Sequence, residues 1–297
     1  MTAPTSLLVA TDFCTDAGHA ARRAAHIAAA RKARLDLLHV VSRGTLDELR
    51  EWMLDAGPRA EAAVVADART QLRALAAALH AESGVTAGQH VAVGRVHEEL
   101  LAATAHADLL VLGARGASPL RDMLLGSTSE RLLRLAVCPI LVVRQAPQGP
   151  YRRVLVPVDF SAHSDAALAL ARGVAPDAEV TLVHAYDLPF EGKLAIAGVP
   201  RSDILTYRAR AQQHALGCMT ALIDRHGGLP GHAPSAVALD DAPRLILATE
   251  QSVGADLIVI GRQGRGMLEE VLLGSVARHV LADAQCDVLV ATLPAAS

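Results

Sequence analysis

A tandem repeat is the feature that most limits what this chain can fold into. All of its matched segments keep an offset of 145 to 148 residues, so two homologous halves follow one another. We expect domains at 1–145 and 151–297, joined by a polar linker at 144–150. The matching segments are Ser6-Leu-Leu-Val-Ala-Thr-Asp12-Phe-Cys with Arg153-Val-Leu-Val-Pro-Val-Asp159-Phe-Ser, Leu37-Leu-His-Val40 with Leu182-Val-His-Ala185, Ala107-Asp-Leu-Leu-Val-Leu-Gly113 with Ala255-Asp-Leu-Ile-Val-Ile-Gly261, and Cys138-Pro-Ile-Leu-Val-Val143 with Cys286-Asp-Val-Leu-Val-Ala291.

Short apolar runs alternate with alanine-rich segments in each half. The runs are nearly continuous rather than alternating, which is typical of parallel strands buried on both faces. Between them, residues such as Ala20, Ala24 and Ile27 repeat at helical spacing. This alternation predicts a doubly wound α/β fold, in which ligands bind at the carboxyl ends of the strands beside the switch in strand order. The first-half strands are expected near 6–12, 35–41, 89–94, 108–113 and 139–143.

Composition excludes several classes of protein. The chain carries 28 Lys and Arg against 31 Asp and Glu and only 2% aromatic residues, a poor match for a nucleic-acid binder. No apolar run approaches the roughly 20 residues that cross a bilayer. The start has no basic segment leading into an apolar one, so we expect a cytoplasmic protein that does not bind membranes. The four cysteines form no CxxC pair, which argues against a zinc site or disulfide framework; Cys138 and Cys286 are expected to be small buried thiols.

A glycine pattern follows the fourth expected strand of each half. In the first half, Gly113-Ala-Arg-Gly116 precedes Gly126-Ser127-Thr128 by nine residues; in the second, Gly261-Arg-Gln-Gly264 precedes Gly274-Ser275 at the same spacing. Glycines let backbone N–H groups approach an anion, and the final Gly-Ser would open a helix with unpaired N–H groups. Phosphate is the ligand that this arrangement favours. Because lysines are few, Arg115, Arg262, Arg265 or a bound cation would balance its charge.

Structural explanations for the same residues stay open. Ser127 and Glu130 could form a capping box that starts a helix without any ligand, and Gly113 could simply end a strand. Asp12 and Asp159 could be turn formers at a strand end. Because Arg278 stands where a second capping box would need an acid, capping alone does not explain both halves.

Both halves resemble the universal stress protein family, specifically its ATP-binding branch, whose hallmark is G-x2-G-x9-G-[ST] after strand four. The resemblance covers nearly the whole chain. It implies two tandem open five-stranded sheets of order 3-2-1-4-5, a Rossmann-like fold similar to the adenine nucleotide alpha hydrolases. It also implies fifth-strand pairing, within the chain as a pseudo-dimer or between two chains as a homodimer.

The resemblance further implies a cofactor, ATP with Mg²⁺, and the residues that hold it in each half. A carboxylate beside a triphosphate must bond a hydroxyl or share a cation, so Mg²⁺ is expected near Asp12 and Asp159. His39 and His184 are expected to be hydrogen-bonded strand-end residues rather than catalysts. The implied binding residues are Asp12, Val40, Gly113, Arg115, Gly116, Gly126, Ser127 and Thr128 in the first half, and Asp159, Ala185, Gly261, Arg262, Gly264, Gly274, Ser275 and Val276 in the second.

Two segments of the second half depart from this pattern. Leu239-Asp-Asp241-Ala-Pro243 replaces the Gly94-Arg-Val turn of the first half, which adds negative charge near a phosphate pocket and predicts a weaker second site. The stretch 187–200 is turn-rich and is expected to be an ordinary surface connection before a helix over 202–227.

The leading functional hypothesis is a nucleotide-dependent regulator or sensor in the stress response, with an unknown protein partner. No catalytic residue is evident, so any ATP hydrolysis would be slow. A hydrolase or ligase on the same sheet would need an SGGxDS loop after strand one, where Thr11-Asp-Phe-Cys-Thr15 stands instead. An electron-transfer flavoprotein or dinucleotide dehydrogenase would need GxGxxG there. A nucleotide-free interaction module is disfavoured by the two intact glycine motifs.

Overall fold

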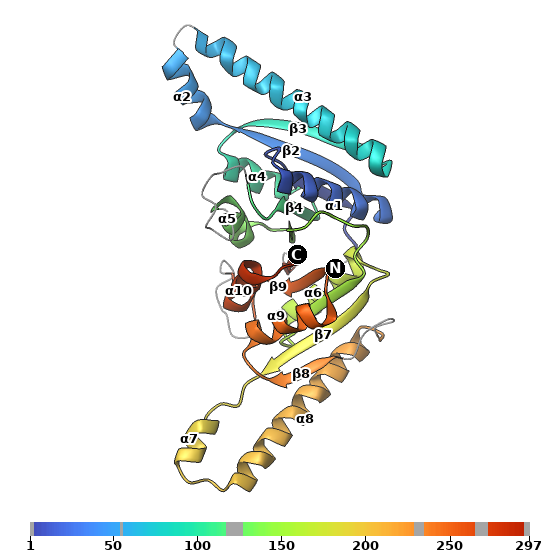
Figure 1. Ribbon diagram of the computed structural model, residues 1–297, viewed down its shortest axis with the longest axis vertical. Coiled ribbons are helices and arrows are strands. Elements are labelled where there is room, and N and C mark those ends of the chain that lie inside the picture. Colours follow the sequence, from blue (N-terminus) through green and yellow to red (C-terminus); the bar gives the residue numbers. More distant parts are fainter. Residues whose placement is uncertain (1–2, 54–55, 117–126, 229–234, 265–272, 294–297) are drawn as a thin grey trace.

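A computed structural model describes residues 3–53, 56–116, 127–228, 235–264 and 273–293, with the side chains of Ser127, Thr128 and Ala195 left undescribed. The chain alternates strands and helices as the apolar runs predict, and the two halves lie one above the other with both chain ends near the middle (Figure 1). The first half comprises β1 Ser6–Ala10, α1 Thr15–Arg31, β2 Arg34–Ser42, α2 Arg43–Met53, α3 Gly57–Ser83, β3 Ala87–Gly94, α4 Val96–Thr104, β4 Leu109–Gly113, α5 Ser127–Leu135 and β5 Ile140–Val143. The second half comprises β6 Arg153–Pro157, α6 Ala162–Val174, β7 Glu179–Tyr186, α7 Glu191–Ile196, α8 Arg201–Arg225, β8 Ala236–Leu239, α9 Ala242–Val253, β9 Leu257–Gly261, α10 Ser275–Asp283 and β10 Asp287–Ala291.

The strands form one sheet in the order β3-β2-β1-β4-β5-β10-β9-β6-β7-β8. Each half therefore has the order 3-2-1-4-5, and its strands pair in parallel. The two fifth strands, β5 and β10, pair antiparallel, with Leu141 opposite Leu289. Because each of these strands already has a neighbour on both sides, a second copy of the chain would have to dock elsewhere.

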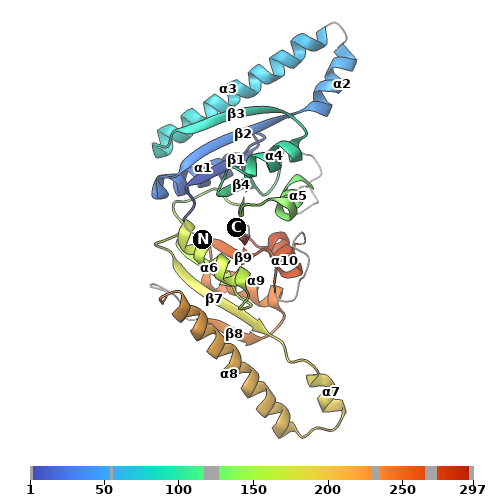
Figure 2. The ribbon, with the colours of Figure 1, turned by 180° about the vertical axis from the view of Figure 1, so that it is seen from behind.

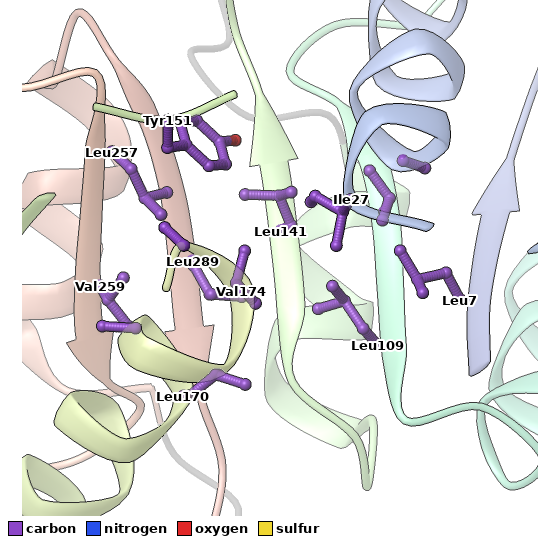
Figure 3. Close-up of a cluster of buried hydrophobic side chains, with 14 of the residues drawn as sticks. Leu7, Ile27, Leu109, Leu141, Tyr151, Leu170, Val174, Leu257, Val259 and Leu289 are labelled. Atoms are coloured by element: carbon purple, nitrogen blue, oxygen red, sulfur yellow. The ribbon is translucent and has the colours of Figure 1, made fainter. Parts of the chain in front are cut away.

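Helices cover both faces of this sheet, and each face has its own apolar core. Helices α1, α3, α6 and α8 pack on one face, where alternate strand residues such as Leu7, Leu109 and Leu289 are buried. Helices α4, α5, α9 and α10 pack on the other. The first of these cores crosses the junction between the halves (Figure 3), so the halves share buried side chains as well as strand pairing.

Small residues on the first helix of each half permit close packing against the sheet. Ala20, Ala24 and Ala167 are fully buried, as their helical spacing predicts. The glycine that ends the fourth strand of each half also lets the first helix of that half lie close to the sheet. A Cβ on Gly113 would lie 2.7 Å from the Asp16 carbonyl carbon, and one on Gly261 would lie 2.7 Å from the His163 Cβ. Gly113 and Gly261 are therefore required by the helix that crosses them, whatever a ligand requires.

A buried polar cluster fastens the junction. The Arg23 side chain on α1 lies 3.2 Å from Asp287 at the start of β10, and the two side chains are 7% and 2% exposed. The Tyr151 hydroxyl donates to the same Asp287 oxygen at 2.7 Å, and the Arg144 N–H donates to the other at 2.8 Å. The Arg23 guanidinium also stacks over the Tyr151 ring at 4.0 Å. Charge buried in this way is tolerated because each group has partners.

The stretch 187–200 connects β7 to α8 at the surface as expected, with Phe190 and Ile196 exposed, but its turn-rich composition does not predict a helix there. It contains the short helix α7, which stands with α8 at one end of the molecule (Figure 2). An Arg208–Glu191 ion pair and a 3.2 Å hydrogen bond from the Tyr207 hydroxyl to the Pro189 carbonyl hold it against α8. Local turn residues do not reveal these contacts, because both partners come from the following helix. The chain's described part contains no helix that could span a membrane.

Candidate functional site

A cavity of about 390 Å³ lies in the second half at the carboxyl ends of β6, β7 and β9. Its position spans β6 and β9, between which the strand order switches, as expected for a ligand site in a doubly wound sheet. The volume is within the range of small-molecule sites. All eight residues predicted for the second half line it: Asp159, Ala185, Gly261, Arg262, Gly264, Gly274, Ser275 and Val276.

Main-chain hydrogen bonds fix the described ends of the glycine loop beside this cavity. The Gly274 N–H donates to the Arg262 carbonyl at 2.9 Å, and the Arg262 N–H donates to the end of β10, at Ala291, also at 2.9 Å. Gly274 is the N-cap of α10 and makes no side-chain cap bond. The first turn of α10, from Ser275 to Ala277, lines the cavity. Its N–H groups and the helix dipole make this wall suitable for an anion.

Asp159 contributes one carboxylate oxygen to local structure and directs the other toward the glycine loop. Its Oδ1 accepts from the Ser161 N–H at 3.0 Å and from the Ser161 and Ser164 hydroxyls at 2.6 Å each. A Cβ built on Gly264 would lie 3.0 Å from Oδ2. Asp159 therefore does stabilise the turn at the strand end, as the sequence left open. It does so through Oδ1, while Oδ2 is the oxygen that faces the glycine loop.

The aromatic residue after this aspartate adopts an unusual backbone conformation in both halves. Phe13 and Phe160 have φ of 65° and 61°, a left-handed region that bulky side chains rarely enter. Each ring contacts the strand-two histidine, with centroids 4.4 Å apart for Phe13 and His39 and 4.3 Å for Phe160 and His184. The His39 and His184 Nδ1 atoms bond strand-end carbonyls at 2.8 and 2.7 Å, which confirms the structural role expected for them. In each half the Asp-Phe pair and the histidine therefore act together to fix the turn that follows the first strand.

The first half repeats the Asp–glycine geometry. The Asp12 Oδ1 accepts from the Cys14 N–H at 3.1 Å, and a Cβ on Gly116 would lie 3.0 Å from Asp12 Oδ2. The Cys14 thiol donates to the Arg115 carbonyl at 3.5 Å, which ties the loop after β4 to the start of α1. Asp12, Gly113, Arg115 and Gly116 are therefore brought together as predicted.

The remaining first-half residues are placed less completely. Val40 lies near the end of β2, two residues beyond Leu38, whose carbonyl accepts from the Thr11 N–H at 3.0 Å. Ser127 and Thr128 begin α5, as the glycine motif predicts. Gly126 lies outside the described residues.

The two halves differ in what surrounds the aspartate. Ser161 and Ser164 donate hydroxyls to Asp159, while Cys14 and Ala17 stand at the equivalent positions beside Asp12. Burial, followed by a hydrogen bond with Asp12, raises the pKa of the Cys14 thiol. Burial lowers the pKa of His163, which takes the place of Asp16. The second site is thus the one in which hydroxyls fix the carboxylate.

The acidic pair that predicted a weaker second site has other partners. Asp241 caps α9 by accepting from the Arg244 N–H at 3.3 Å, and Asp240 lies 3.1 Å from the Arg244 guanidinium. Of this segment, Ala242 is the residue that lines the cavity. The guanidinium of Arg244 therefore partly balances the charge of Asp240, while Asp241 serves as a helix cap.

A sequence model of the universal stress protein family matches residues 5–144 and 150–292, one match for each half. The chain belongs to the universal stress protein family. Universal stress protein Rv2623 of Mycobacterium tuberculosis is 30% identical over 96% of this chain and 95% of its own length. Universal stress protein Rv2005c of the same species is 33% identical, with 62% of each chain aligned, so the match covers less than two thirds of that relative. A crystal structure of a universal stress protein from Archaeoglobus fulgidus DSM 4304 superposes with a TM-score of 0.67 at 20% identity, covering 97% of this chain and 98% of that one. This last likeness supports the fold.

Several residues of this universal stress protein's cavity were not predicted from the sequence. Ser164, Ile246 and Gln263 line it, and Gln263 is nearly buried. Ser164 had a signal, because it lies one helical turn after the Ser161 that follows the Asp-Phe pair. Ile246 had none, since an apolar residue on α9 is indistinguishable from core. Cys138 and Cys286 are buried as expected, and burial raises the pKa of Cys138 to about 11.

Proposed function

We propose that this universal stress protein binds ATP with Mg²⁺, one nucleotide in each half, and acts as a nucleotide-dependent regulator or sensor in the stress response. The observation that carries the proposal is the convergence of all eight predicted second-half residues on one cavity at the strand-order switch. Three of its glycines recur at the same spacing in the first half, where the described part of the motif has the same Asp–glycine geometry.

The chemistry of the cavity lining fits such a ligand. Val183, Ala185 and Ile246 offer an apolar surface of the kind that an adenine ring contacts. Gly264 and Ser275 offer main-chain N–H groups and a hydroxyl for phosphates, and Arg262 supplies positive charge. Asp159 Oδ2 would accept from a ribose hydroxyl or share a cation. Among the described residues no three His, Cys, Asp or Glu side chains form a metal cluster, so Mg²⁺ would take most of its oxygens from phosphate and water.

The same lining supports regulation over catalysis. Asp159 is its one carboxylate among the described residues, and three donors already occupy Oδ1. If Asp159 Oδ2 bonds a ribose hydroxyl or shares a cation, that carboxylate cannot also take a proton from water as a general base. The alternative function, a slow ATPase or nucleotide hydrolase on this fold, would depend on a residue outside this set.

Calorimetric titration of the full chain with MgATP tests the proposal. We expect binding of up to two nucleotides per chain, and chromatography with mass analysis of denatured protein would identify any nucleotide that copurifies. A chain that neither carries nor binds adenine nucleotide would refute the proposal. Phosphate release at about 1 to 10³ s⁻¹, the range of dedicated enzymes, would favour the hydrolase alternative instead.

A further inference from the structure

The most exposed apolar side chains of this protein lie at its two ends. Among the described residues, the three large apolar side chains with the greatest exposure are Ile196 at 89%, Trp52 at 84% and Phe190 at 67%. Trp52 lies in the last turn of α2, while Phe190 directly precedes α7 and Ile196 ends it. Figures 1 and 2 show α2 and α7 at opposite ends of the long axis, both projecting on the side of the molecule that carries α5 and α10. Large aromatic side chains left in water at such projections are typical of protein–protein contact sites.

The two ends occupy equivalent places in the tandem repeat. Helix α2 follows the second strand of the first half, and α7 follows the second strand of the second half. Further exposed apolar side chains enlarge each surface, since Met53 beside Trp52 is 45% exposed and Leu205 on α8 is 52% exposed. We call α2 the first-half tip and residues 190–210 the second-half tip.

The two tips carry opposite net charge. Helix α2 holds three acidic residues against two basic ones, and one of the basic residues, Arg50, is paired with Glu61 on α3. Residues 191–210 hold four basic residues against two acidic ones, and one of the basic residues, Arg208, is paired with Glu191. A first-half tip is therefore attracted to a second-half tip, while two identical tips repel each other. The other exposed residues that give the tips this charge are Asp47, Glu48, Glu51, Lys193, Arg201 and Arg210.

A second copy of the chain can supply the complementary tip. The two tips of one copy lie too far apart to meet, because they stand at opposite ends of the molecule (Figure 1). A twofold axis midway between them exchanges the tips, so one rotation places the first-half tip of each copy on the second-half tip of the other. Because both tips project on the same side, two copies can face each other and make both contacts at once. Pairing through the fifth strands is closed to a second copy, since β5 and β10 already pair with each other.

We propose that two copies of this chain associate through their tips in a closed twofold dimer, with the first-half tip of each copy on the second-half tip of the other. In each of the two contacts, Trp52 of one copy packs against Phe190 and Ile196 of the second copy. The contact needs no ligand in either half, so the dimer is tested independently of the proposed nucleotide binding.

The fluorescence of Trp52 reports on this contact directly, because Trp52 is the only tryptophan of the chain. The full chain is followed by sedimentation velocity and by tryptophan emission between about 0.1 and 100 μM, a span that includes the micromolar affinities of small interfaces. We expect dimer to form as concentration rises, with a shift of Trp52 emission to shorter wavelength and weaker quenching by acrylamide. A chain that stays monomeric throughout, or a dimer in which the emission of Trp52 stays that of the monomer, would overturn the proposal. So would a monomer whose emission shifts only when vesicles of phosphatidylcholine and phosphatidylserine are added, because the tips would then bind a membrane.

Truncation of the same side chain tests its energetic part in the dimer. Trp52→Ala should weaken the dimer dissociation constant by roughly 30-fold or more, the loss typical of an aromatic side chain at the centre of an interface. Val137→Ala is the matched control, because Val137 is also exposed, at 66%, but lies just after α5, away from both tips. Equal dissociation constants for the native chain and Trp52→Ala would contradict the proposed contact.

Reversal of charge distinguishes this arrangement from any other dimer. One chain carries Glu48→Arg with Glu51→Arg, and a second chain carries Lys193→Glu with Arg201→Glu. Alone, each should dimerise at least about tenfold more weakly than the native chain, because like charges then face each other in both contacts. Mixed together, the two chains should regain the native affinity, since a mixed pair has one native contact and one contact with both charges exchanged.

Asp177→Arg with Asp224→Arg is the control for the change in net charge. Both residues are exposed; Asp224 lies at the opposite end of α8 from the tip, and Asp177 lies before the start of β7. This variant should dimerise as the native chain does. If either tip variant alone dimerises as well as the native chain, or if mixing the two restores nothing, the pairing of unlike tips is wrong.

Discussion

Substitution of Gly264 by alanine should weaken ligand binding at the second-half cavity much more than it lowers the stability of the fold. The added Cβ would lie 3.0 Å from Asp159 Oδ2, the one atom of the described residues beyond its chain neighbours that comes within 4 Å of it. The clash is thus with a side-chain tip, not with backbone. The sequence alone suggests that this methyl would occupy the phosphate position; the structure makes the aspartate its nearest neighbour.

The magnitude follows from how Asp159 is held. Because three donors fix Oδ1, Oδ2 can yield only by leaving its preferred rotamer, which costs about 0.5–1.5 kcal/mol of folding stability. Losing one charge-assisted contact to the ligand costs about 1.5–3 kcal/mol, or a roughly 10- to 150-fold weaker Kd. Calorimetry with MgATP and thermal unfolding measure the two effects separately.

Two other glycines provide the comparison. Gly217→Ala in α8 adds a Cβ that meets no atom of the described residues within 4 Å, so it should raise stability by about 0.8–1 kcal/mol and leave binding unchanged. Gly261→Ala would clash with His163 at 2.7 Å and should cost about 1–3 kcal/mol of stability. Equal second-site affinities for the native chain and Gly264→Ala would refute the assignment of this loop to ligand binding.

Three further predictions concern stability and reactivity. Asp287→Asn should lower the free energy of unfolding, measured in denaturant, by about 3–5 kcal/mol, because it leaves Arg23 charged and buried. The control Asp240→Asn removes an exposed ion pair and should cost at most about 1 kcal/mol. Equal costs for the two variants would contradict the role of Asp287 in stabilising the junction between the halves. The lowered pKa of His163 means that the unfolded chain binds its proton more readily, so stability should fall as pH drops below about 6.5, and His163→Gln should flatten that slope in pH-dependent denaturation. At pH 8 about one Cys138 side chain in a thousand should be a thiolate. Mapping of iodoacetamide labelling should therefore find Cys138 unmodified while the half-exposed Cys218 reacts. Early labelling of Cys138 would show that its side chain is not held in the core.

The repeated spacing identifies three glycines that the structure brings to one cavity, Gly261, Gly264 and Gly274. A Cβ would be excluded most clearly at Gly261, where it would lie 2.7 Å from the His163 Cβ. The interpretation of individual glycines was less complete. Gly261 is explained by its contact with the first turn of α6, and that contact joins residues nearly 100 positions apart. The helix α7 within 187–200 was missed for a similar reason, since its supports come from α8.

The sequence by itself determined the α/β class, the two halves, the family and the glycine loops, because strand periodicity and loop composition are local physical requirements. Only the tertiary structure decided that β5 and β10 join the halves into one sheet, that hydroxyls of Ser161 and Ser164 hold Asp159, and that Arg262 reaches Ala136. An arginine in a loop can extend to any carbonyl within its length. Which carbonyl it meets depends on how distant segments pack, and residue spacing does not encode that.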